Sequence, residues 1–255
     1  MSWAAFSVYM IWDYQNYLAG KLATAKLPSR HPLVPFWRSQ LHMVPLVLYN
    51  QLVVWPLVQL LFLWPTWQSR QAPVWGPGGW GWWTIPCLLA GMLISDVLWY
   101  WSHRLMHVPF AWKHWHRMHH VAEQTAISAT FVHPVEYALF TLAMNAPFAL
   151  AGFPAWVHAV PLGWGMFTGS GAHSGYSGDF ANGDEHNGHH LYHNVNFGLL
   201  MVADRIWGTH WSPGDPKPAL WSEAERIFRE YKNVYGNEEA TTKLPPPARK
   251  ANKAA

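Results

Sequence analysis

Histidines with ligand-like spacing dominate one stretch of this chain, because 13 of its 16 histidines lie between His103 and His193. They form H-x-x-x-H at His103 and His107, H-x-x-H-H at His116, His119 and His120, and H-x-x-H-H again at His186, His189 and His190. Residues at i, i+3 and i+4 share one face of a helix, so each cluster is expected to direct its imidazoles at one point. Neutral imidazole binds iron, zinc, copper or nickel. Eight such side chains exceed the needs of one ion, and the sequence therefore predicts two metal ions close together.

Each cluster also has an ordinary interpretation. A lone histidine is most often a surface or core residue, and a single H-x-x-x-H motif arises easily by chance. Three clusters within 91 residues are hard to explain in that way. The set as a whole therefore favours metal binding.

The ligand types narrow the chemistry. No cluster contains the glutamate of the H-E-x-x-H zinc-protease motif. Cys87 is the only cysteine, which excludes both an intrachain disulfide and a cysteine-ligated iron–sulfur cluster. Copper and zinc stay open on ligand type alone. A pair of irons that uses O2 is favoured if the substrate offers only inert C–H bonds.

The elements that must position these histidines have the composition of a membrane protein. Charged residues make up only 12% of the chain, and 19 residues are tryptophan, which favours bilayer interfaces. Three stretches contain no Asp, Glu, Lys or Arg: 31 residues after Arg38, 25 after Arg70 and 42 after Glu136. A spanning helix needs about 20 apolar residues. We expect spans at 43–64 and 82–101 and a helical hairpin in the third stretch; a soluble protein with long buried helices is the alternative.

These expectations define an all-α integral membrane bundle of about four spans with a helical, histidine-rich cap. Residues 1–40 form an interfacial and basic segment, 41–212 the core, and 213–255 an amphipathic helix at 222–235 with a disordered tail. Lys and Arg precede the first span, so the histidine clusters and both termini are expected in the cytosol. A formal charge of +3 suits a protein beside anionic lipid, and nothing resembles a nucleic-acid surface.

Five segments carry a resemblance to a known family. They are DVLWYWSHRLMH (96–107), HWHRMHH (114–120), FVHPVEY (131–137), AHSGY (172–176) and HNGHHLYHNVNFGLLMVADRIWGT (186–209). In order and spacing they resemble the fatty acid hydroxylase / sterol desaturase superfamily of membrane di-iron oxidases, over roughly residues 85–210. The resemblance implies a four-span core, two irons, O2 as oxidant, and electrons from cytochrome b5 or an NAD(P)H reductase. No cytochrome b5 module is present in the sequence, so the donor is expected to be a separate protein.

Carried over residue by residue, the resemblance implies a set of iron ligands. They are His103, His107, His116, His119, His120, His173, His186, His189 and His190. His133, in H-P-x-E, is a further ligand candidate or a group that orients a ligand. Asp96, on the helical face of His103, and Asp184, just before His186, could each accept a hydrogen bond from a ligand imidazole or serve only in packing. Some family members have another histidine at the position of Gly169, which this chain lacks.

The substrate implied by the resemblance is a lipid. H-P-V-E together with A-H-S-G-Y is similar to the sterol branch, and the third histidine motif to its C-5 desaturases, with C-4 methyl oxidases also in that branch. The glycine in H-N-G-H-H keeps a fatty acyl or sphingolipid hydroxylase open. The implied membrane is the endoplasmic reticulum, or the inner membrane in a bacterium. A metal transporter and a catalytically silent relative are the competing hypotheses; histidines outside the spans argue against the first, and an intact ligand set against the second.

Overall fold

Helices account for all the regular structure in the part of the chain that is described. This computed structural model describes residues 2–27, 40–68, 84–122, 124–153, 155–177 and 183–218, and these contain no β-strand. The long helices are α1 (Ser2–Leu18), α7 (Thr84–Met106), α10 (Pro134–Leu150) and α11 (Ala155–His173). A helical class was expected, and these residues agree with it.

Another long helical stretch is divided by wider turns. It runs through α4 (Val44–Tyr49), the π-helical η1 (Asn50–Val54), α5 (Trp55–Val58), the π-helical η2 (Gln59–Leu63) and α6 (Trp64–Gln68). Pro56 lies in this stretch. It has no backbone N–H to donate to the carbonyl four residues earlier, so a locally wider turn is a natural accommodation.

Short elements complete the chain and carry most of the histidines. They are α2 (Leu22–Ala25), α8 (Pro109–Ala111), the π-helical η3 (Trp112–His116), α9 (Arg117–His120), the 3-10 helix η4 (Ala126–Thr130), α12 (Gly183–Tyr192) and α13 (Val202–Trp207).

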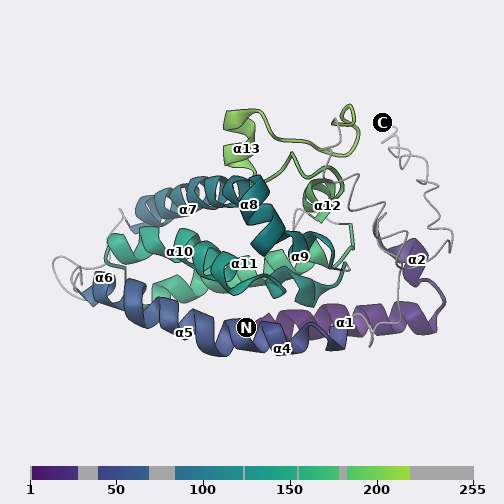
Figure 1. Ribbon diagram of the computed structural model, residues 1–255, viewed down its shortest axis with the longest axis horizontal. Coiled ribbons are helices and arrows are strands. Elements are labelled where there is room, and N and C mark those ends of the chain that lie inside the picture. The colour runs from purple at the N-terminus through teal and green to yellow at the C-terminus, as the bar shows by residue number, and fades with distance from the viewer. Residues whose placement is uncertain are drawn as a thin grey trace, which may run out of the picture.

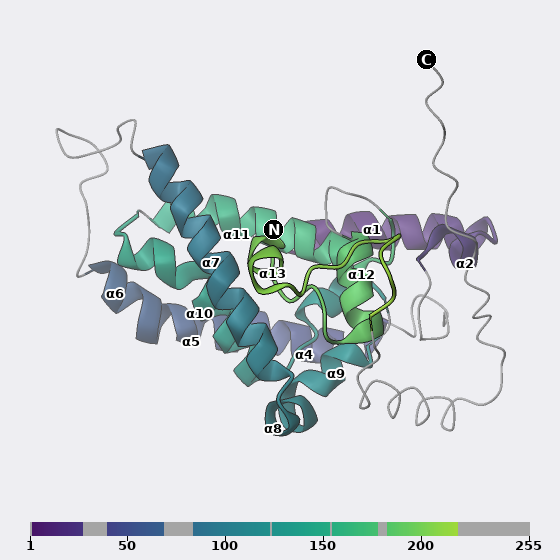
Figure 2. The same ribbon diagram turned by 90° about the horizontal axis from the view of Figure 1, so that it is seen from above.

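Helix α10 is the centre of the arrangement. It packs against α7 on one side, against the α5–α6 stretch on the other, and against α11. Figure 1 shows α10 and α11 between α7 above and α5 below. Figure 2 shows from above that α7 crosses over α10, with α12 and α13 near its histidine-bearing end. This packing brings one end of α7, α10 and α11 close to α9 and α12.

Two of the described helices are long and apolar enough to cross a membrane: Val44–Thr66 and Ile85–Met106. The first matches the span expected at 43–64. The second was expected to end at residue 101, before His103, but α7 continues to Met106. Between Trp101 and Pro109 there is neither proline nor glycine to end the helix, so His103 projects from the spanning helix itself rather than from a following loop.

The expected hairpin is present as two helices, α10 and α11. Its turn includes Gly152, whose φ of 73° lies in the left-handed region that glycine tolerates. Neither helix is among those that meet the length and hydropathy of a span within the described residues. Four spans therefore stay a prediction, as do the cytosolic orientation and the division at residues 40 and 212.

The outer faces of the two candidate spans are apolar. Leu52, Leu60 and Leu61 on the first, and Ile85 and Leu89 on the second, are each more than half exposed. Contiguous apolar surface of this kind is rare on soluble monomers. It fits membrane association. Of the interfacial and basic segment expected at 1–40, residues 28–39 lie outside the described residues, and so does the C-terminal helix expected at 222–235.

Candidate metal centre

Nine imidazoles converge in two groups at one end of the bundle. The first group is His103, His107, His116, His120 and His189, and the second is His119, His173, His186 and His190. Within each group the candidate ligand atoms all lie within 4.8 Å of one another. These are the same nine side chains that the family resemblance implied as ligands.

The sequence motifs are divided between the two groups in a way that spacing did not predict. Each H-x-x-H-H motif was expected to direct all its imidazoles at one point. Instead, His116 and His120 join the first group, whereas His119 joins the second. Residues at i and i+4 lie about 40° apart around a helix, whereas i+3 and i+4 lie about 100° apart, so adjacent histidines diverge.

The third motif is divided in the opposite sense. His186 and His190 belong to the second group, and His189 reaches across to the first. Each H-x-x-H-H motif therefore contributes an i, i+4 pair to one group and its central histidine to the other. The two groups are interlocked by α9 and α12, and neither can form without both helices.

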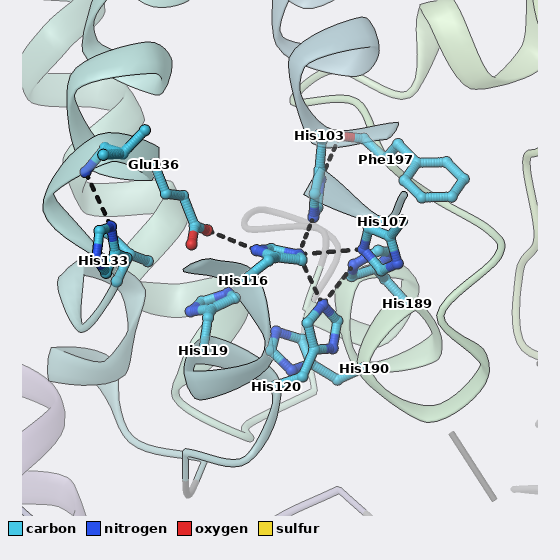
Figure 3. A network of polar contacts seen from close by, with 12 residues as sticks. His103, His107, His116, His119, His120, His133, Glu136, His189, His190 and Phe197 are labelled. Atoms are coloured by element: carbon cyan, nitrogen blue, oxygen red, sulfur yellow. Dashed lines mark hydrogen bonds and ion pairs between the residues drawn. The ribbon is translucent and has the colours of Figure 1, made fainter. Parts of the chain in front are cut away.

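The short distances between ring nitrogens are better explained by binding to a shared metal ion than by hydrogen bonds between the rings. Figure 3 shows His116 at the middle of the first group. Its Nε2 lies 3.2 Å from Nε2 of His103, 3.1 Å from that of His107 and 2.9 Å from that of His120. A neutral imidazole nitrogen carries either one proton or one lone pair, so it cannot satisfy three such neighbours. A cation between them can.

Backbone carbonyls fix the tautomer of three of these histidines. Nδ1 of His103 donates to the Phe197 carbonyl at 2.8 Å, and Nδ1 of His189 donates to the Val195 carbonyl at 2.7 Å. In the second group, Nδ1 of His173 donates to the Gly169 carbonyl at 2.8 Å. Because a neutral ring has one proton, Nε2 of each ring presents a lone pair to its group.

Glu136 is a candidate functional residue that the sequence motifs did not single out. Its Oε1 lies 2.7 Å from Nδ1 of His116, and both side chains are fully buried. A carboxylate in this position orients a metal-ligating imidazole and raises its basicity. The signal was available in H-P-V-E, where the glutamate, rather than the histidine, faces the cluster.

His133 lies outside both groups. It caps the N-terminus of α10, its Nδ1 accepting from the backbone N–H of Val135 at 3.2 Å, and its ring stacks near Trp115. Figure 3 shows it beside Glu136 and away from the converging imidazoles. In this arrangement His133 holds the helix start that carries Glu136.

Asp96 contacts no imidazole among the described residues, but it organises the loop that follows His193, whose carbonyls contact two imidazoles. Its buried carboxylate accepts from the backbone N–H groups of Leu200 and Ala203 at 2.7 and 2.8 Å. Asp204 likewise accepts from the N–H groups of Phe197 and Gly198 at 2.8 and 2.7 Å. The two aspartates shape the segment whose carbonyls orient His103 and His189. Asp184 accepts from the Ser177 hydroxyl at 2.8 Å instead of from an imidazole.

Burial keeps the imidazoles neutral. Desolvation lowers the pKa of His119, His186 and His190 well below the usual value, and repulsion by neighbouring imidazoles lowers it further. The same causes lower the pKa of His116 and His189. Neutral rings with free lone pairs are the form that binds a metal.

An apolar cavity of about 730 Å³ reaches the imidazoles. His103 of the first group and His119, His173 and His186 of the second form part of its wall. The rest of the wall is largely aromatic and aliphatic, with Trp55, Trp99, Phe140, Phe148 and Trp164 among its residues. The volume lies within the usual range for a site that holds one small ligand.

Comparison with known proteins shows which family the histidine-rich part of the chain resembles. The sequence profile of the fatty acid hydroxylase family matches residues 88–209. The chain is 29% identical over 174 residues to human "Fatty acid hydroxylase domain-containing protein 2", covering 64% of this chain and 50% of the relative. It is 30% identical over 167 residues to a "Delta(7)-sterol 5(6)-desaturase" of Gibberella zeae, covering 60% and 49%.

A further relative is a "Putative methylsterol monooxygenase" of Dictyostelium discoideum, 35% identical over 97 residues that cover 36% of this chain and 34% of the relative. The chain spans about half the length of the first relatives it matches. No solved structure matches it. The matched residues include all nine converging histidines together with Glu136. Together these matches support the fatty acid hydroxylase / sterol desaturase superfamily as the group of proteins to which this chain is similar.

Proposed function

We propose that this protein is a membrane oxidase that holds two iron ions and uses O2 to desaturate or hydroxylate a lipid. The observation that carries the proposal is the pair of imidazole groups at the end of an apolar cavity. Hydrolysis of a polar substrate would not need an apolar cavity of this kind. Oxidation of an unactivated C–H bond needs a strongly oxidising centre beside such a cavity.

The donor set fits two transition-metal ions. Five imidazoles would hold one ion and four the other, with Glu136 orienting His116 and with backbone carbonyls orienting three other rings. When bound, the iron pair would supply the capacity to activate O2 for C–H cleavage. The chain's own contribution is to keep the rings neutral, fix their tautomers and exclude water from the reacting carbon.

A sterol is the favoured substrate class. Two relatives carry sterol reactions in their names, a sterol desaturase and a putative methylsterol monooxygenase. A fatty acyl or sphingolipid substrate is the alternative, and one relative, from Mycosarcoma maydis, is named "Fatty acid hydroxylase ahd1". Which carbon is oxidised depends on how the cavity orients the lipid.

The reaction needs a source of electrons. Hydroxylation and desaturation with O2 each consume two electrons beyond those of the substrate, with water as the other product. We propose a separate cytochrome b5 or NAD(P)H-dependent reductase as donor, meeting the protein on the cytosolic side of the endoplasmic reticulum or bacterial inner membrane. A metal transporter would need ligands along a path through the spans, whereas the described groups gather at one end.

Metal content tests this proposal. In detergent-purified protein we expect about two irons per chain, falling to about one in His119→Ala, which removes a ligand of the second group only. O2 consumption with a reductant and a sterol mixture should be lost in the same variant. His114→Ala is the matched control and should keep both irons, because His114 is exposed and belongs to neither group. An iron-free wild-type protein, or one whose O2 consumption survives His119→Ala, would refute the oxidase.

A further inference from the structure

The α10 wall of the cavity has a polar patch within its apolar stripe. Residues along this face line the cavity for almost the whole length of the helix: Tyr137, Phe140, Thr141, Met144, Asn145 and Phe148. Thr141 and Asn145 are one turn apart and therefore neighbours on the helix surface. Both are more than nine-tenths buried, with 8% and 4% of their surface exposed.

The carboxamide of Asn145 is only half satisfied. Its Nδ2 donates to the Thr141 carbonyl at 2.8 Å, which fixes the orientation of the amide and leaves Oδ1 as an acceptor. Within the described part of the chain, neither this oxygen nor the Thr141 hydroxyl has a hydrogen-bond partner. Ser95, facing them from α7, differs because its hydroxyl donates to the Met144 carbonyl at 3.1 Å.

Unpaired polar groups in an apolar cavity are costly. A polar group that is desolvated without a partner destabilises the folded protein. Buried polar groups in folded proteins are therefore nearly always satisfied, by protein, water or ligand. An acceptor and a hydroxyl side by side, both facing a ligand cavity, match a group that can donate one hydrogen bond and accept another.

We propose that Thr141 and Asn145 bind a free hydroxyl group of the lipid substrate. The lipid hydroxyl donates to Oδ1 of Asn145 and accepts from the hydroxyl of Thr141. This inference rests on the proposed function, since it takes the cavity as the substrate site. An ether or ester oxygen cannot donate, so a lipid whose hydroxyl is blocked leaves Asn145 unsatisfied and binds more weakly.

The position of this pair also orients the lipid. Three helical segments run along the cavity, at 92–103, 137–148 and 162–173. In each segment the residue farthest from the imidazoles is apolar. At about 1.5 Å per residue each segment is about 16 Å long. Glu136, which contacts His116, marks the imidazole end of α10, and Thr141 and Asn145 lie about 8 and 14 Å farther along the helix.

The hydroxyl is therefore held away from the metal centre, and a carbon remote from it is presented for oxidation. In a sterol, C-4 and C-5 lie close to the ring hydroxyl, so this orientation selects against the C-5 and C-4 reactions that the sequence motifs favoured. A carbon at the opposite end of the ring system, or far along a hydroxylated chain, fits the separation.

Paired ligands that differ only at the hydroxyl test the proposal. Binding of tritiated cholesterol and its 3-O-methyl ether, and of 1-octadecanol and its methyl ether, is measured in detergent micelles. Wild type should bind at least one alcohol about tenfold more tightly than its ether, which corresponds to about 1.4 kcal/mol. Asn145→Leu should bind both members of that pair equally, and Thr141→Val should lose part of the preference. Ser170→Ala is the control, because Ser170 lies outside the cavity lining and its hydroxyl donates to the Met166 carbonyl at 2.6 Å.

Equal binding of alcohol and ether by wild type in both pairs, or a preference kept in Asn145→Leu, would overturn the proposal. If Asn145→Leu does not fold, the alcohol-over-ether preference of Thr141→Val tests the proposal, and a preference as large as that of wild type would overturn it. Iron content and O2 consumption of the same samples separate the two proposals. A preference for alcohols without iron or O2 consumption would uphold the hydroxyl site and refute the oxidase. Oxidation of the ether as fast as the alcohol would uphold the oxidase and refute the hydroxyl site.

Discussion

At the scale of single residues, the metal centre depends on groups that never touch a metal. Gly198 illustrates this, because a Cβ at this position would lie 2.8 Å from a carboxylate oxygen of Asp204 and 2.8 Å from one of Asp96. Both carboxylates are fully buried and hold the loop that supplies carbonyls to His103 and His189. There is no room here for even one methyl group.

We expect Gly198→Ala to lower thermal stability by about 1–3 kcal/mol, as overpacking typically does, and to lower iron content as well. Gly169→Ala is the matched control, since a Cβ there has no atom within 4 Å and Gly-to-Ala in a helix is stabilising by up to about 1 kcal/mol. Thermal unfolding in detergent and metal analysis measure both. A Gly198→Ala protein as stable and iron-rich as wild type would show that the loop is not tightly constrained.

At the scale of elements, Asp13 of α1 forms a buried ion pair with Lys26 and a hydrogen bond with Tyr176 of the motif that carries His173. Lys26 Nζ lies 2.9 Å from Asp13 Oδ2 and also donates to the Gln124 carbonyl at 2.8 Å. Asp13 in turn accepts from the Tyr176 hydroxyl at 2.9 Å. Desolvation raises the pKa of Asp13 and lowers that of Lys26, while their mutual attraction opposes both shifts. The pair thus binds α1 beside the second histidine group.

Breaking this pair should cost more than replacing it. We expect Lys26→Met to destabilise the protein by about 3–5 kcal/mol, because Asp13 is left buried and uncompensated. The double variant Asp13→Leu with Lys26→Met should recover most of that loss, since it leaves no buried charge. A double-mutant cycle of thermal stability measures the coupling. Additive single and double effects would mean that the two side chains do not interact energetically.

At the scale of the whole molecule, the two candidate spans expose apolar surface and the histidines gather at one end of α7. Cys87 lies near the other end of the same helix and is exposed. If α7 crosses the bilayer, these two ends face opposite compartments, which gives the expected orientation a direct test with the protein's own cysteine.

An impermeant maleimide should label Cys87 in vesicles only from the side opposite the cytosol. In a Cys87→Ala background, Lys217→Cys, an exposed position beyond the histidine region, should be labelled only from the cytosolic side. Mass spectrometry of sealed and opened vesicles reads out both. Labelling of the two positions from the same side would contradict the expected orientation.

The sequence by itself determined the helical class, the two long apolar helices and, by motif spacing, eight of the nine converging histidines. Helical periodicity and charge-free length are local properties, and three clustered motifs leave few other interpretations. His173 and the A-H-S-G-Y segment around it became recognisable as part of the site only through the family resemblance. A lone histidine forms no spacing pattern with other histidines.

Only the tertiary structure decided how the ligands are shared between the groups. The crossing of His119 and His189 depends on how α9 and α12 face each other, and no local pattern encodes that angle. Packing between distant segments also decides that Glu136, rather than His133, contacts His116. For the same reason, Asp96 acts on the site through a loop about 100 residues away in sequence. Periodicity gives the face of a helix, whereas the partner of that face is set by packing between segments far apart in the chain.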